Sequence, residues 1–123
     1  MNERDPLIAI YGSSSVGPSD PAYRMAFELG GELARAGAAI VTGGYGGVME
    51  AASRGAHEAG GDVVGVTVEL FERRGPVNAW VREHVHTTDL FERIGTIVRR
   101  SDGFVVAPGS IGTLAELAAP RPA

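Results

Sequence analysis

Five short runs with β-strand character recur along the chain, and stretches with helical periodicity separate most of them. The runs cover residues 7–11, 38–42, 63–68, 84–87 and 104–107. The resulting order is β-α-β-α-β, a loop, then β-α-β-α, and each connection is long enough for a right-handed crossover. Continuous apolar runs are typical of parallel strands that are buried on both faces. The pattern therefore predicts an α/β fold with an open, mostly parallel sheet and helices on both faces.

Length and composition limit the classes of protein to which this chain can belong. With 123 residues, of which 44% are hydrophobic, it is long enough for one domain with a core. The net charge of −4 argues against a nucleic-acid partner held by a broad basic surface. Without cysteine it has neither disulfides nor thiolate metal sites. No signal peptide or membrane-spanning run is evident, so we expect a cytoplasmic protein with no membrane partner.

The stretch from Phe104 to Leu117 combines a strand, a glycine turn and the start of a helix. The apolar run breaks at Pro108-Gly109, and a helical pattern begins after Gly112-Thr113. Free backbone N–H groups and the helix dipole then point at one spot, which suits an anion such as phosphate. Glu116, one turn into that helix, is expected to lean over the same spot. The alternative is an ordinary βα turn that uses glycine for geometry alone.

Three further segments are expected at the same edge of the sheet. Residues 12–17 follow the first strand, residues 43–47 follow the second, and Arg93 follows the fourth. Ligands of open α/β sheets bind beyond the carboxyl ends of the strands, so the convergence predicts a nucleotide site. We expect Arg93 and Glu116 to lie beyond neighbouring strands and to face one ligand. The serines after the first strand either contact that ligand or only cap and turn the chain.

Other sites receive less support from the sequence. The dinucleotide fingerprint GxGxxG is absent, so no NAD or other cofactor is expected. His84 and His86 alternate along a strand and could chelate, but no third ligand is near them in sequence and no metal is expected. The loop from Glu69 to Arg82, which contains Trp80, is long enough to be functional or to contact a partner. The sequence does not distinguish these two roles.

Three motifs in the same order resemble the Lonely Guy (LOG) family, also called lysine decarboxylase-like, of Rossmann-fold nucleotide-binding proteins. Gly12-Ser13-Ser14-Ser15, followed by Pro21 and Tyr23, resembles the opening motif of that family. The segment 43–49 (GGYGGVM) resembles GGGxxGLMG, and the segment 108–116 (PGSIGTLAE) resembles PGGxGTxxE. The resemblance covers nearly the whole chain.

The resemblance implies an activity and a set of site residues. Studied members are dimeric phosphoribohydrolases that cleave cytokinin riboside or other purine nucleoside 5′-monophosphates into the free base and ribose 5-phosphate. By this resemblance the catalytic residues would be Arg93 and Glu116. The nucleotide-binding residues would be Gly12, Ser13, Ser14, Gly43, Gly44, Gly46, Gly47, Gly109, Ser110, Gly112 and Thr113.

The chain also departs from the family pattern. Ile94 stands where the family has lysine, Ser110 replaces a glycine, and Thr67-Val68 replaces Ile-Pro. Residues 118–123 end the last helix early, so we expect one domain over 1–123 that lacks a final strand and helix. Three interpretations stay open: a nucleotide hydrolase, a non-catalytic nucleotide or cofactor carrier, and a remnant that depends on another subunit.

Overall fold

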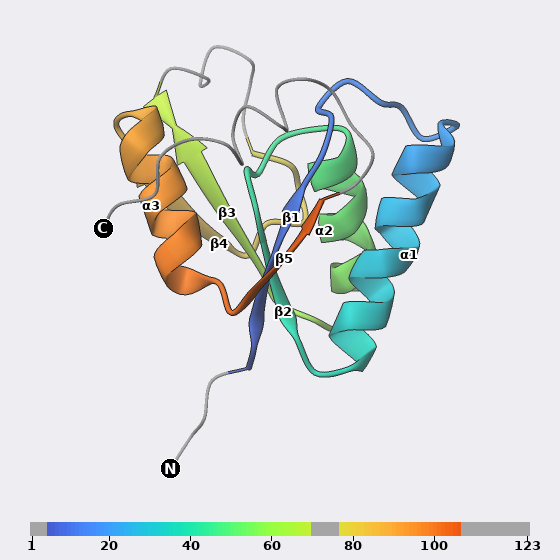
Figure 1. Ribbon diagram of the computed structural model, residues 1–123. Helices are drawn as coiled ribbons and strands as arrows, with labels where there is room; N and C mark the ends of the chain where they lie inside the picture. The colour runs from blue at the N-terminus through green and yellow to red at the C-terminus, as the bar shows by residue number, and fades with distance from the viewer. Residues whose placement is uncertain (1–4, 70–76, 107–123) are drawn as a thin grey trace.

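The computed structural model describes residues 5–69 and 77–106; residues 1–4, 70–76 and 107–123 lie outside the described part. Within that part no helix has the length and hydropathy needed to cross a bilayer. The α/β prediction is confirmed (Figure 1). The elements in chain order are β1 (Leu7–Tyr11), α1 (Pro21–Arg35), β2 (Ala39–Thr42), α2 (Val48–Glu58), β3 (Val63–Val68), β4 (Glu83–Thr87), α3 (Leu90–Arg100) and β5 (Gly103–Val106).

The described strands form one parallel sheet in the order β4-β3-β2-β1-β5. Strand β1 lies near the centre, where Ala9 pairs with Val41 of β2. Strand β3 lies beside β2 on the side away from β1, and its Val66 pairs with Val85 of β4. Because all five strands are parallel, the segments that follow β1, β2, β3 and β4 emerge at the same edge.

One expectation about this sheet is wrong. Strands β4 and β5 are not neighbours, because β3, β2 and β1 lie between them. After β4, which is the outermost strand on one side of the sheet, the chain passes through α3. It then adds β5 beside β1 as the outermost described strand on the other side. Arg93 follows β4, whereas Glu116 follows β5 in sequence and lies outside the described residues. The two therefore do not follow adjacent strands.

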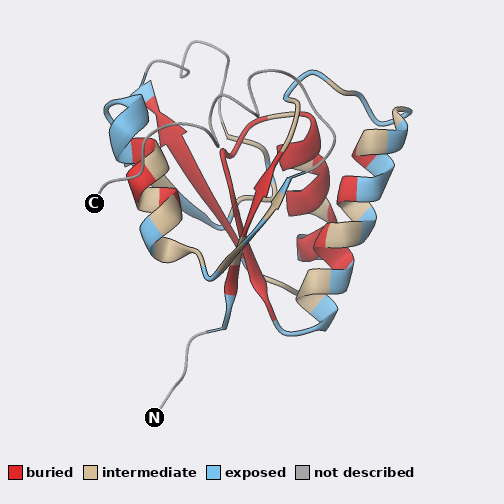
Figure 2. Cartoon of the chain, in the orientation of Figure 1, coloured by how far each residue is buried: buried red, intermediate tan, exposed pale blue. Residues whose placement is uncertain are grey.

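The helices cover the two faces of the sheet unequally (Figure 1). Helices α1 and α2 pack on one face, where Ile10 and Ile40 point into a shared core. Helix α3 packs on the other face, where Ile97 joins Val41 and Val66. Successive strand residues thus serve opposite cores, as the pleat requires. The central strands are accordingly buried on both faces (Figure 2), as the continuous apolar runs predict.

Helices α1 and α2 touch each other backbone to backbone. A Cβ at Gly30 of α1 would collide with the carbonyl oxygen of Ala52, and one at Gly55 of α2 would collide with that of Phe27. Neither glycine has a positive φ, so each is needed for space and not for conformation. Small residues on both helices therefore bring α2 directly against α1.

The helix that carries Arg93 has a well-defined start. The Asp89 carboxylate accepts a hydrogen bond of 2.8 Å from the backbone N–H of Glu92, as a capping box predicts. The Glu92 carboxylate reaches one residue further back than in that motif. It accepts from the Thr88 hydroxyl at 2.6 Å and the Thr88 N–H at 3.0 Å. These two bonds hold the pKa of Glu92 below its ordinary value.

Candidate functional site

The carboxyl ends of β1, β2 and β3 bring several predicted site residues together. The loop after β1 and the loop after β2 contact each other directly, because the Val48 N–H donates to the Ser13 carbonyl at 2.9 Å. Gly12 leaves room for the Val48 side chain, which a Cβ at residue 12 would approach to 2.6 Å. A Cβ at Gly47 would collide with the backbone of Ser13 and Ser14. The two loops therefore form one continuous surface.

We call residues Gly43–Gly47 the glycine-rich loop, and its glycines serve different purposes. Gly44 and Gly47 have φ values of +84° and +68°, which residues with side chains rarely adopt. Gly43 has no positive φ, but a Cβ there would collide with the Arg93 guanidinium and approach the Met49 sulfur to 2.6 Å. The loop thus requires glycine for conformation at two positions and for space at a third.

Arg93 reaches this loop from the opposite face of the sheet. The residue is only 7% exposed although it carries a charge. Its Nε–H donates to the Val66 carbonyl at 3.1 Å, so β3 anchors the side chain. Its guanidinium lies against Gly43 at the end of β2. Although Arg93 follows β4, which lies away from the centre of the sheet, α3 therefore brings its side chain to the end of β2.

The serines after β1 show the structural role that the sequence left open. Ser13 Oγ and Ser15 Oγ are hydrogen bonded at 2.9 Å, and the Ser15 N–H donates to Ser13 Oγ at 3.2 Å. These bonds stabilise a local turn of the kind that serine favours. Ser14 is exposed. Contact between these serines and a ligand stays a prediction.

Asn78 contacts the glycine-rich loop and was missed by the sequence analysis. Its backbone N–H donates to the Gly44 carbonyl at 2.7 Å, and its side-chain amide donates to the Tyr45 carbonyl at 2.9 Å. Its side-chain oxygen accepts from the Trp80 N–H at 3.1 Å. The one signal in the sequence was a polar amide between Val77 and Ala79 in a loop of unassigned role.

The predicted phosphate loop falls outside the described residues. It comprises Gly109, Ser110, Gly112 and Thr113, and the predicted catalytic Glu116 lies outside with it. Their roles stay predictions. Within residues 5–69 and 77–106, no three His, Cys, Asp or Glu side chains gather as metal ligands would. His84 instead shares a hydrogen bond with Thr67 through its Nε2.

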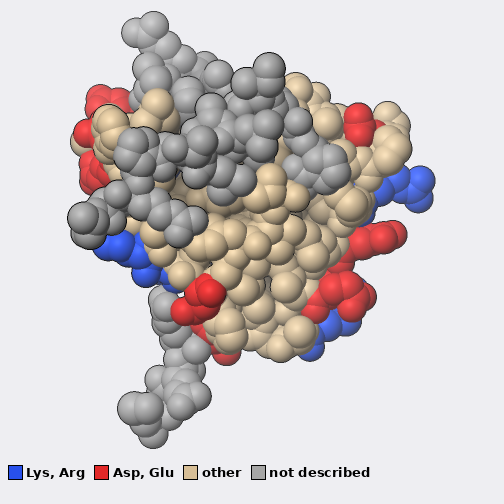
Figure 3. Space-filling view, in the orientation of Figure 1, with Lys and Arg blue, Asp and Glu red and all other residues tan. Residues whose placement is uncertain are grey.

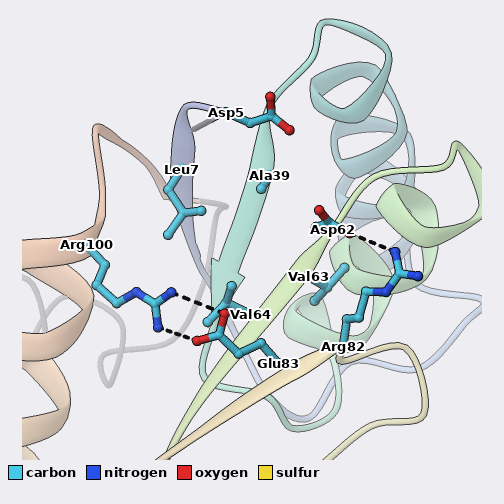
Figure 4. Close-up of a pocket in the computed structure, with 9 residues that line it drawn as sticks. All are labelled: Asp5, Leu7, Ala39, Asp62, Val63, Val64, Arg82, Glu83 and Arg100. Atoms are coloured by element: carbon cyan, nitrogen blue, oxygen red, sulfur yellow. Dashed lines mark hydrogen bonds and ion pairs between the residues drawn. The ribbon is translucent and has the colours of Figure 1, made fainter. Parts of the chain in front are cut away.

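A cavity of about 570 Å³ lies at the amino ends of the strands, away from the glycine-rich loop (Figure 4). Two ion pairs lie among its lining residues: Arg100 Nη1 to Glu83 at 2.7 Å, and Arg82 Nη1 to Asp62 at 2.8 Å. The Arg100 guanidinium holds the pKa of Glu83 below its ordinary value. Each of these arginines is already neutralised by a carboxylate. This end of the sheet is therefore poorly suited to bind phosphate.

The charged side chains do not form a continuous basic surface on the face that Figure 3 shows. Acidic and basic groups of the described residues alternate around an uncharged centre (Figure 3). Together with the net charge of −4, this distribution offers no broad site for a nucleic-acid backbone on that face.

Comparisons with known proteins extend these observations. A cytokinin riboside 5′-monophosphate phosphoribohydrolase of Arabidopsis thaliana, LOG4, is 32% identical over 89% of this chain and 52% of its own length. An uncharacterized protein of Archaeoglobus fulgidus is 34% identical over 78% of this chain and 62% of its own. The chain thus spans about half to two thirds of the length of these relatives.

Solved structures with the same fold include molybdenum cofactor proteins. The molybdenum cofactor binding protein of Rippkaea orientalis superposes with a TM-score of 0.79 at 30% identity, covering 95% of this chain and 71% of that one. The molybdenum cofactor carrier protein of Chlamydomonas reinhardtii superposes with a TM-score of 0.76 at 29% identity, covering 94% and 69%. The model of the SLOG cluster4 family matches residues 5–121. The chain therefore belongs to the SLOG cluster4 family, the LOG-like proteins that its motifs resemble.

Proposed function

We propose that this protein hydrolyses the N-glycosidic bond of a purine nucleoside 5′-monophosphate. The observation that carries the proposal is the buried Arg93, whose Nε–H is fixed by Val66 and whose guanidinium lies against Gly43. A guanidinium held in this way is suited to bind a phosphate or a base edge through paired hydrogen bonds. The relatives named as phosphoribohydrolases support the same class of substrate.

The proposed reaction breaks the bond between the ribose C1′ and the base nitrogen. Positive charge builds on the ribose as the bond lengthens, and a carboxylate stabilises it or positions the attacking water. We assign this carboxylate to Glu116 and the binding of phosphate or leaving base to Arg93. Water supplies the hydroxyl at C1′, and its proton leaves with the base. The products are the free base and ribose 5-phosphate.

A non-catalytic carrier is the second candidate. Two observations favour it: the similarity to molybdenum cofactor proteins, and Ile94, which stands where the LOG pattern has lysine. A carrier would bind a phosphorylated ligand at the same loops without turning it over. The two candidates therefore predict the same stabilisation by a ligand but opposite results in an assay of base release.

A panel of nucleoside monophosphates tests both candidates in one experiment. Each nucleotide is screened for thermal stabilisation of the protein and for release of free base by chromatography. We expect stabilisation on the order of 1–3 kcal/mol at ligand concentrations of roughly ten to a hundred times the dissociation constant. Base release supports the hydrolase, saturable stabilisation without release supports the carrier, and no response to any nucleotide contradicts both.

The same proposal includes a homodimer and a cytoplasmic location. LOG-like enzymes are dimers, and two exposed apolar side chains, Leu90 and Phe91, begin the helix that carries Arg93. Nucleoside monophosphates are cytoplasmic metabolites, so the proposed substrate implies that compartment. Cell fractionation followed by detection of the protein tests the location.

A further inference from the structure

We propose that Asn78 is a positioning residue that holds the glycine-rich loop in the conformation needed to bind an anion. The inference rests on the proposed function, because it assigns the loop a phosphorylated ligand. It gives a role to a segment between β3 and β4 that no sequence motif explains.

Every polar atom of Asn78 has a partner among the described residues. Two of its bonds go to successive carbonyls of the loop, those of Gly44 and Tyr45. The side-chain oxygen accepts from the Trp80 N–H, and the backbone oxygen accepts from the Val81 N–H at 3.3 Å. The side chain is thus held by its own segment while its amide group holds the loop.

Because the peptide unit is planar, the bond to the Tyr45 carbonyl also fixes the direction of the next N–H in the loop. In a trans peptide the C=O and the following N–H point in opposite directions. Since the Tyr45 carbonyl points at Asn78, the N–H of Gly46 points away from it. Gly46 is also the one partly exposed residue of the glycine-rich loop, and no hydrogen-bond acceptor for its N–H occurs within residues 5–69 and 77–106. An accessible N–H of this kind is a suitable anion donor.

The loop is held on its other side by backbone contacts that Asn78 does not share. The Ser13 carbonyl accepts from the Val48 N–H, and Gly47 packs against Ser13 and Ser14. Between these contacts and the Tyr45 carbonyl that the Asn78 side chain holds lies Gly46, which as a glycine has wide conformational freedom. Removing the Asn78 amide would therefore release this part of the loop while leaving its ends attached.

Two substitutions distinguish the role of the Asn78 amide donor from that of its side-chain oxygen. Asn78→Asp keeps the oxygen that accepts from Trp80 but replaces the amide donor with an oxygen that faces the Tyr45 carbonyl. Asn78→Ala removes both groups. Ser101→Ala is the control, because it removes a 2.6 Å bond from a side chain to a backbone carbonyl at the far end of α3. All variants are compared below their melting temperatures, with folding verified by circular dichroism.

The first measurement needs no ligand. Order parameters from ¹⁵N relaxation are determined for the Tyr45 and Gly46 amides. We expect them to fall from the rigid range of about 0.85 toward 0.6 in both Asn78 variants and to stay unchanged in Ser101→Ala. Unchanged order parameters in Asn78→Ala and Asn78→Asp would overturn the positioning role, whatever the protein binds.

The second measurement is the affinity for AMP by calorimetry. We expect both Asn78 variants to bind AMP about tenfold more weakly, since the loop must be ordered on binding, while Ser101→Ala binds as the wild type does. A mobile loop with unchanged AMP affinity would overturn the link between Asn78 and the ligand. If the wild type binds neither AMP nor any other nucleoside monophosphate of the panel, the proposed function fails, and a loop that is nevertheless released by the substitutions still supports Asn78 as the residue that holds it.

Discussion

The Arg93 guanidinium occupies the space in which a side chain at Gly43 would begin. The two residues come from opposite sides of the sheet, one from helix α3 and one from the end of β2. Gly43 has an ordinary φ, so the absence of a side chain matters here for space alone. A glycine at this point therefore determines where a buried cation can lie, which a motif written as consecutive glycines does not reveal.

We predict that Gly43→Ala destabilises the protein through Arg93. The added methyl overlaps the guanidinium, and overpacking of this kind costs about 1–3 kcal/mol of unfolding free energy. In an Arg93→Ala background the same substitution should cost less, with a coupling energy of at least about 0.5 kcal/mol. Urea unfolding of the four proteins measures the cycle.

The control for that cycle is Gly17→Ala. A Cβ at Gly17 meets no atom within 4 Å and requires no positive φ. Its effect on stability should be small and independent of Arg93. Additive costs for Gly43→Ala and Arg93→Ala would contradict the contact between the two residues.

Substitutions at the two proposed catalytic residues should have different kinetic effects. Glu116→Gln keeps the shape of the side chain but loses its charge, so we expect base release to fall at least about 100-fold with nucleotide binding largely intact. Arg93→Ala should weaken both binding and turnover, because the guanidinium acts before and during the reaction. Steady-state rates and calorimetric affinities measure both effects. Robust base release by the Glu116→Gln protein would exclude Glu116 as the catalytic carboxylate.

The Asp89 cap should affect the site as well as stability. Asp89→Ala removes the bond to the Glu92 N–H and should cost about 1 kcal/mol of unfolding free energy. Because Arg93 lies in the first turns of the same helix, we also expect weaker nucleotide binding. Asp20→Ala is the matched control, since Asp20 caps α1 through an equal 2.8 Å bond to the Ala22 N–H. Equal loss of affinity in both variants would show that the effect is not transmitted through α3.

The Glu83–Arg100 ion pair should make stability depend on acid pH. Arg100 lowers the pKa of Glu83 in the folded protein, so the pair stabilises the fold at neutral pH. That contribution should be lost as the pH falls below the ordinary pKa of a glutamate, about 4.3, and through the lower pKa of Glu83 in the folded protein. Glu83 is about half exposed, which limits the effect to a few tenths of a kcal/mol. The difference in unfolding free energy between wild type and Glu83→Gln should therefore shrink toward zero at low pH; a difference that stays constant would contradict the assignment.

Self-association is the last prediction. Phe91 is 74% exposed at the start of α3, beside the exposed Leu90, and adjoining exposed apolar side chains are typical of interaction sites. We expect a dimer by light scattering and a weaker dimer for Phe91→Ser, with little change in the stability of the monomer. A wild-type protein that remains monomeric at high micromolar concentration would contradict this prediction.

Local structure was largely predictable from the sequence. The strand Leu7–Tyr11 has the predicted bounds, and α1 begins at Pro21 after the Asp20 cap, which is the common chemistry of a helix start. These features depend on neighbouring residues, whose side-chain period and capping chemistry can be identified directly. Even so, Glu92 bonds to Thr88 instead of completing a standard capping box with the Asp89 N–H.

Contacts between distant segments could not be predicted in the same way. The separation of β4 from β5 depends on which side of β1 the chain adds its last described strand, and the residues of either strand are compatible with both choices. The role of Asn78 depends on the path of the segment between β3 and β4 across the glycine-rich loop. Sequence identifies a polar residue there, but its hydrogen-bond partners in the glycine-rich loop lie more than 30 residues away.

The contact between α1 and α2 has a mechanical consequence. Gly30 and Gly55 let the two helices meet without intervening side chains, so we expect the pair to move as one rigid unit. The turns at the amino ends of both helices are attached to this unit and cannot separate unless the contact between α1 and α2 is lost. Helix α3 is attached to the opposite face through longer side chains such as Ile97 and Arg93. If the protein closes around a ligand, the hinge therefore belongs on the α3 side.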